Sequence, residues 1–76
     1  MNTPSYPERA TNAGQRQLLR CVRAKKLRQV DVASALGVSV GEAWRILHGV
    51  RVPPSHAVRL AARAAFGIGT EAWEGR

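Results

Sequence analysis

The chain has 76 residues, with twelve Lys and Arg against five Asp and Glu, which gives a formal charge of +7. This length suits one small domain, near the lower limit at which a core is stable without metals or disulfides. The single cysteine, Cys21, excludes an internal disulfide, and no Cys/His pattern suggests a metal. We therefore expect a cytoplasmic protein without cofactors. No apolar run is long enough to span a membrane, and the positive charge favours a polyanionic partner.

Residues 1–11 contain Pro4 and Pro7 and show no periodicity, which predicts a flexible arm ahead of a folded domain at residues 12–76. Asn12, three residues before Gln15, resembles a capping box, so a first helix is expected from about Ala13 to Lys26. Its inner side is expected to hold Leu18, Cys21 and Val22, with Leu19 partly, and its outer side Arg16, Arg20 and Arg23. The arginines form either a solvated face or part of a phosphate-binding surface.

Between Gln29 and Gly49 the sequence predicts two short helices hinged at Gly37, where glycine tolerates the left-handed backbone that ends a helix. Ser39, three residues before Glu42, forms a capping box that opens the second of these helices. The apolar residues fall at helical spacing and define a buried side for each helix. They are Val32, Ala33 and Leu36 in the first helix, and Ala43, Ile46 and Leu47 in the second.

A helix, a short turn containing glycine and a second helix make a helix-turn-helix, whose second helix reads the major groove of DNA. The residues that carry a family likeness are Leu27-Arg28-Gln29, Ala33, Leu36-Gly37-Val38-Ser39, Arg45-Ile46 and Gly49. Together they resemble the phage-repressor/Cro type (XRE-like) helix-turn-helix family over roughly residues 15–68. The resemblance implies an all-α, lambda-repressor-like bundle of four to five short helices. It also implies a bacterial or phage transcriptional regulator that binds specific double-stranded DNA, with homodimers on half-sites expected from geometry.

By this resemblance the recognition helix spans about residues 40–48, and its base-reading positions are Val40, Gly41, Trp44 and Arg45. Only Arg45 has donors that match O6 and N7 of guanine, and Val40 suits a thymine methyl. Trp44 has two interpretations, packing over the edge of the core, which we favour, or contact with DNA or a partner. The positions expected at the phosphates are Lys26, Arg28, Gln29, Ser39, His48 and Arg51.

The sequence departs from the family pattern at two places. Arg28 stands where the family often has Ser or Thr as a helix cap, and Asp31 in the first turn is expected to compensate in part. Leu47 and Val22 stand where the family commonly has a Glu–Arg pair. Replacing both partners of a buried ion pair by apolar residues is often neutral or stabilising, so this paired change supports the predicted fold.

After a loop at residues 50–55, Ser55 is expected to cap a fourth helix that ends near Phe66. Its predicted outer side has His56, Arg59 and Arg63, and its predicted inner side has Ala57, Val58, Leu60, Ala61, Ala64 and Ala65. A last short helix is expected to begin with Thr70 as its cap. Trp73 and Ile68 are expected to fold back on the core, and a dimer contact is the alternative.

No nucleophile with a base, carboxylate pair or phosphate-binding glycine loop is recognisable, so an enzyme is not expected. Three hypotheses remain. The first is the sequence-specific regulator. The second is a protein-interaction module, such as an antitoxin or accessory subunit, that uses Trp44, Trp73 and the valine-bearing loop at residues 50–55 to bind a protein partner. The third is a non-specific nucleic-acid binder that uses the basic first helix.

Overall fold

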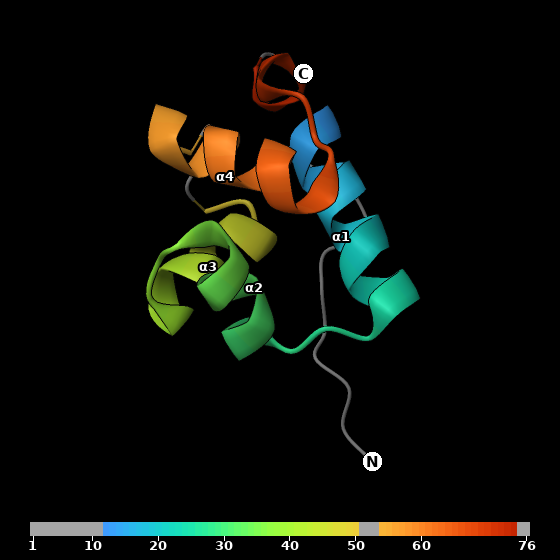
Figure 1. The fold of residues 1–76 in the computed structure, drawn as a ribbon, viewed down its shortest axis with the longest axis vertical. Helices are drawn as coiled ribbons and strands as arrows, with labels where there is room; N and C mark the ends of the chain where they lie inside the picture. The colour runs from blue at the N-terminus through green and yellow to red at the C-terminus, as the bar shows by residue number, and fades with distance from the viewer. Residues whose placement is uncertain (1–11, 51–53, 75–76) are drawn as a thin grey trace.

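The computed structural model describes residues 12–50 and 54–74, and the regular structure within them is entirely helical. Its elements are α1 (Ala13–Lys25), α2 (Gln29–Leu36), α3 (Val40–Leu47), α4 (His56–Phe66) and the short 3-10 helix η1 (Thr70–Trp73). Figure 1 shows α1 along one side of the molecule, α2 and α3 together on the other, and η1 returning to the start of α1. The predicted all-α bundle of short helices is confirmed. The predicted arm at residues 1–11 lies outside the described residues.

Three of the four predicted helix caps are confirmed. The side chains of Asn12, Ser39 and Ser55 accept hydrogen bonds from the backbone N–H three residues on, at 2.8, 3.1 and 3.3 Å. Each bond satisfies an N–H that the first helical turn leaves without a partner. The fourth prediction is wrong, because Gly69 holds the cap position of η1 and Thr70 is already its first helical residue.

The core combines the apolar sides of all five elements. Its fully buried side chains include Leu18, Ile46 and Leu47, and Ile68 and Trp73 are each 1% exposed. Val22 is 3% exposed, so both positions where the family has charged partners are apolar and buried, as predicted. The predicted return of Ile68 and Trp73 to the core is also confirmed. On the inner side of α1, Cys21 is only half-buried, whereas Leu19 is 3% exposed and belongs fully to the core.

The prediction for the inner side of α4 is largely wrong. Ala57, Ala64 and Ala65 are exposed and Leu60 is 46% exposed, and the buried Ala62 was not predicted. Val58 and Ala61 pack on the core as predicted. Apolar residues occupy eight of the eleven positions of this helix, so their spacing allows more than one buried face. Arg59, predicted on the outer side, is half-buried; its Nε donates to the carbonyl of Pro54 at 3.0 Å and its Nη1 to Glu74 at 3.2 Å.

Contacts between distant parts of the chain fix α1 against η1 and α3. The side-chain amide of Asn12 donates to the backbone carbonyl of Trp73 at 3.1 Å. The indole of Trp73 packs on Gly14, where a Cβ would lie 2.7 Å from ring carbon Cε2. The buried amide of Gln15 donates to the carbonyl of Leu47 at 2.9 Å. Since Leu47 is the last residue of α3, α1 holds the end of that helix in place.

Candidate nucleic-acid interface

Helix α3 has one buried side and one exposed side, as a recognition helix requires. Ala43, Ile46 and Leu47 are each 0% exposed. A three-residue turn joins α3 to α2, and Gly37 in this turn adopts φ 71° and ψ 35°, which glycine tolerates without a clash of a side chain. Helix α3 packs against α2 and α1, and the described residues leave its opposite side uncovered.

The exposed side of α3 carries the four predicted base-reading residues. Val40 is 45% and Trp44 is 44% exposed, and Gly41 and Arg45 are exposed as well. At about 100° per residue, Gly41 lies opposite the buried residues, in the middle of the exposed side. Val40 and Trp44, four residues apart, lie on one flank of Gly41, and Arg45 lies on the other. The exposed side therefore has an apolar flank and a cationic flank.

Trp44 is 44% exposed and is not one of the buried residues of the core, so part of its ring is accessible to DNA or a partner. Its ring stacks on the ring of His48, with centroids 4.1 Å apart and planes 21° from parallel. Nδ1 of His48 lies 2.9 Å from the carbonyl oxygen of Trp44, and it donates a hydrogen bond there in the Nδ1–H tautomer. The stack holds Trp44 against α3 while much of its surface stays exposed.

Arg45 is available for contacts beyond the chain. Its side chain is 50% exposed and its Nη1 lies 3.5 Å from Oε1 of Glu42, one turn back on α3. An exposed ion pair at this separation contributes between zero and about 1 kcal/mol. Exchanging Glu42 for a base edge therefore costs Arg45 little.

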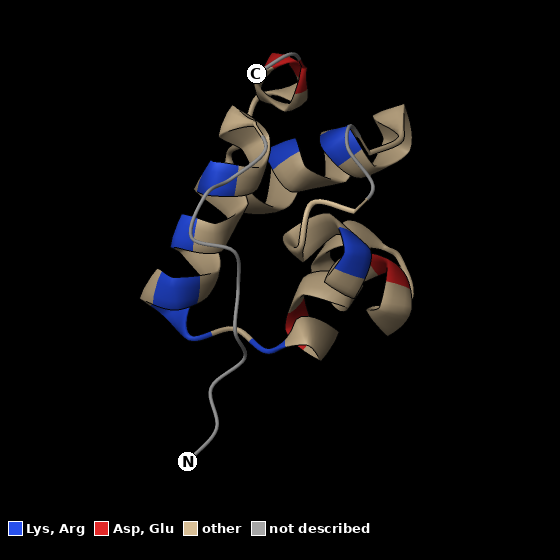
Figure 2. Ribbon diagram, turned by 180° about the vertical axis from the view of Figure 1, so that it is seen from behind, with Lys and Arg blue, Asp and Glu red and all other residues tan. Residues whose placement is uncertain are grey.

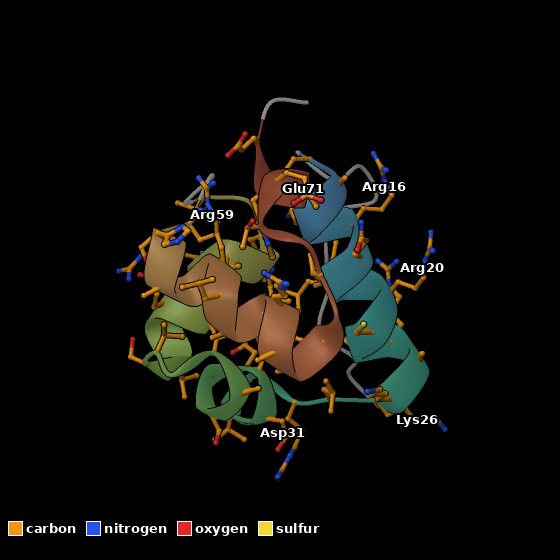
Figure 3. All side chains as sticks on the ribbon, turned by 45° about the horizontal axis from the view of Figure 1, so that its top comes forward. Arg16, Arg20, Lys26, Asp31, Arg59 and Glu71 are labelled. Carbon is orange, nitrogen blue, oxygen red and sulfur yellow. The ribbon has the colours of Figure 1, made fainter. Side chains whose placement is uncertain are left out.

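Basic residues run along the outer side of α1 and continue to the start of α2. Figure 2 shows Lys and Arg along α1 and its connection to α2, and in Figure 3 the side chains of Arg16, Arg20 and Lys26 point away from the molecule. All members of the group are exposed: Arg16, Arg20, Arg23, Lys25, Lys26 and Arg28. We call these six residues the basic segment. Its charge is suited to a phosphate backbone.

The start of α2 is organised by Arg28 and Asp31. The backbone N–H of Arg28 donates to Oδ2 of Asp31 at 2.9 Å, and the guanidinium pairs with the same carboxylate at 3.3 Å. Asp31 thus binds the backbone N–H of a cap residue whose own side chain makes no capping hydrogen bond. The hydrogen bonds from Arg28 lower the pKa of Asp31 below its ordinary value, and the same contact raises the pKa of Arg28. Gln29 follows as the half-buried first residue of α2.

The remaining predicted site residues differ in what the structure describes of them. The hydroxyl of Ser39 accepts the N–H of Glu42 and so has a role in the fold. His48 is half-buried beneath Trp44. Arg51 lies outside the described residues. Sequence reasoning missed Gln15 as a support of α3, because nothing local in the sequence links it to Leu47 thirty-two residues away.

Searches of protein-family models, curated proteins and solved structures find no match to this chain.

Proposed function

We propose that the chain is a sequence-specific regulator that binds double-stranded DNA and inserts α3 into the major groove. The observation that carries the proposal is the exposed side of α3, where Arg45 and an apolar flank stand on a helix whose other side is fully buried. An α-helix with its side chains is about 10–12 Å across, which matches the width of about 12 Å of the major groove. The resemblance of residues 15–68 to the phage-repressor/Cro type family supports the same function.

In this proposal Arg45 reads a guanine and Val40, Gly41 and Trp44 lie against neighbouring base edges. The phosphates are bound by the residues around the start of α2 and the ends of α3: Lys26, Arg28, Gln29, Ser39, His48 and Arg51. The exposed cations of the basic segment and the N-terminal end of α2 suit this role, because both attract anions. A cytoplasmic location goes with such a function.

A single recognition helix covers only a few base pairs, so we infer that two copies bind half-sites about one helical turn apart. The side chain of Trp73 is 1% exposed within the bundle, so it does not contribute to the surface through which the two copies would pair. Sedimentation of the protein with a duplex of one and of two half-sites measures the stoichiometry.

Fluorescence anisotropy with labelled duplexes tests the function. The DNA upstream of the protein's own gene is compared with a scrambled duplex of equal composition, at low and at physiological salt. A specific regulator should prefer the upstream duplex by about a thousandfold or more at physiological salt. Equal binding that collapses as salt rises would show that only phosphates are bound, and would favour a non-specific binder.

Substitution of Arg45 by Ala tests its role in base readout. We expect a loss of about 1–3 kcal/mol of discrimination at one base pair, with the preference elsewhere unchanged. Arg63, an exposed arginine of α4, provides the matched control, because Arg63→Ala removes the same charge away from α3. A preference profile that Arg45→Ala leaves unchanged would overturn the assignment.

A protein-interaction module, such as an antitoxin, is the second candidate, and the exposed ring of Trp44 is the observation that favours it. Large exposed aromatic side chains often mark binding surfaces for proteins. The buried position of Trp73 removes the other tryptophan from such a surface. Co-purification of a protein partner that survives nuclease treatment and is lost in Trp44→Ala would support this candidate.

A further inference from the structure

We infer that α3 recognises the C5-methyl group of a pyrimidine next to a guanine. In this inference the apolar flank formed by Val40 and Trp44 contacts the methyl group, and Arg45 contacts the guanine. It rests on the proposed function and specifies the base step that the helix selects. Thymine and 5-methylcytosine present the same methyl group in the major groove, so both are included.

The apolar flank is the first observation. Val40 and Trp44 lie one turn apart on α3, and nearly half of each side chain is exposed. The stack on His48 restrains the ring of Trp44, so little side-chain freedom is lost when it binds. These two side chains offer no charged or hydrogen-bonding group apart from the indole N–H. A methyl group is the apolar feature that a base edge presents in the major groove.

Gly41 is the second observation, because the fold does not explain it. A Cβ at this position would meet only the hydroxyl of Ser39, at 4.0 Å. Its φ is not among the positive values of the glycines in the described residues, so alanine fits the backbone. Alanine is also the better helix former. A glycine in the middle of the exposed side therefore serves the close approach of a binding partner, here the edge of a base pair.

The cationic flank is the third observation and sets the neighbouring base. Arg45 follows Trp44 directly and lies about 100° further round the helix, on the other side of Gly41. Arginine binds O6 and N7 of guanine with two hydrogen bonds. Adjacent base pairs are about 3.4 Å apart. The apolar flank and Arg45 lie close together, with only Gly41 between them. They can therefore contact a methyl group and a guanine on consecutive base pairs.

The charge of the described residues favours DNA over an apolar protein. Glu42 is the only acid on α3 and is paired with Arg45. The six cations of the basic segment are all exposed. A partner that contacts both α3 and the basic segment must be anionic as well as able to present an apolar group. DNA with exposed methyl groups meets both conditions.

The test uses the full chain and the duplex that it selects from a randomised pool. Each thymine of this duplex is replaced in turn by deoxyuridine, which removes the methyl and keeps the base pairing. At one or two thymines beside a guanine, the affinity should fall about fourfold, which corresponds to the free energy of burying one methyl carbon. Replacing such a thymine–adenine pair by cytosine–guanine should weaken binding, and 5-methylcytosine at that position should restore about the same factor.

Variants connect the methyl effect to α3. Trp44→Ala and Val40→Ala should bind the selected duplex more weakly and no longer distinguish thymine from deoxyuridine. Leu60→Ala is the matched control, since Leu60 on α4 is 46% exposed and should retain the fourfold effect. Because Val40, Trp44 and Leu60 are all exposed, circular dichroism should show an unchanged fold in each variant.

The outcomes separate this inference from the proposed function. Selection of a distinct sequence that binds equally well with and without every methyl group overturns the inference and leaves the regulator standing. Failure to select any sequence overturns both. A third outcome is that Trp44→Ala loses a protein partner but keeps its DNA preference and its methyl effect. This result would assign the apolar flank to the protein partner and overturn the inference.

Discussion

Gly14 and Gly41 allow one substitution to be tested in two opposite environments. Each is the second residue of its helix, α1 and α3, and each follows a polar cap at the same distance. At Gly14 a Cβ would lie 2.7 Å from ring carbons of Trp73, whereas at Gly41 the nearest atom is 4.0 Å away. The change from glycine to alanine brings the same gain in helix propensity at both positions, so the difference between them measures packing.

The expected effects have opposite signs. Alanine is favoured over glycine within a helix by about 0.5–1 kcal/mol, and Gly41→Ala should show most of this as added stability. At Gly14 the added methyl overlaps a rigid ring that is 1% exposed and whose backbone carbonyl is bound by Asn12. Overpacking of this kind costs about 1–3 kcal/mol, so Gly14→Ala should lose roughly 1–2 kcal/mol of stability after the helix gain.

Thermal and urea denaturation, followed by circular dichroism, measures both variants against the parent chain. For a domain of this size, 1 kcal/mol corresponds to about 4–8 °C in Tm. Gly14→Ala should therefore melt lower by roughly 4–16 °C, and Gly41→Ala should melt higher by a few degrees. Equal stabilisation by both substitutions would refute the packing of Trp73 on α1, and destabilisation by Gly41→Ala would refute the open space over α3.

Three further predictions concern single positions. Gln15→Ala removes a buried amide that donates to Leu47 and leaves a cavity. Urea denaturation should therefore show that the free energy of unfolding falls by about 2–4 kcal/mol. A fall of less than ~1 kcal/mol would contradict the support of α3 by α1. The lowered pKa of Asp31 means that its contact with Arg28 stabilises the fold above the ordinary value of 3.8, and this contribution is lost as pH falls through the lower folded value; denaturation from about pH 5 to about pH 2 should show a smaller acid loss in Asp31→Asn. Lys26 has a left-handed backbone with φ 55° and ψ 46°, so Lys26→Gly should gain about 1 kcal/mol of stability and lower the salt slope of DNA binding by about one; an unchanged slope would remove Lys26 from the phosphate contacts.

Local signals in the sequence were sufficient for the helices and for the exposed side of α3. Caps such as Ser39 and Ser55, with glycine at Gly37, act through bonds and backbone angles within a few residues, so they can be recognised without the fold. Helix α2 begins at Gln29 and ends before the hinge at Gly37, as predicted, and α3 and α1 end within one residue of their predicted ends at residue 48 and Lys26. Gly41 and Arg45, two of the four predicted base-reading positions, lie on the exposed side because helical spacing alone places them there.

What the sequence did not reveal depends on contacts between distant residues or on ambiguous patterns. The hydrogen bond from Asn12 to Trp73 joins residues sixty-one apart, and no local pattern marks it. Eight of the eleven residues of α4 are apolar, so its buried side is set by the helices that it meets. Trp44 lies at the boundary between the two sides of α3, where helical spacing does not choose between packing and exposure.

Gly41 and Lys26 share a property that links stability to the proposed interface. At each position the fold would accept a residue that stabilises it, alanine in the open space over α3 and glycine in the left-handed backbone after α1. Both positions belong to the set that the sequence assigns to DNA, one for bases and one for phosphates. Residues that are suboptimal for folding are expected where they serve binding. Gly41→Ala and Lys26→Gly should therefore each raise the free energy of unfolding and weaken DNA binding, and a variant that gained stability with unchanged affinity would remove its position from the interface.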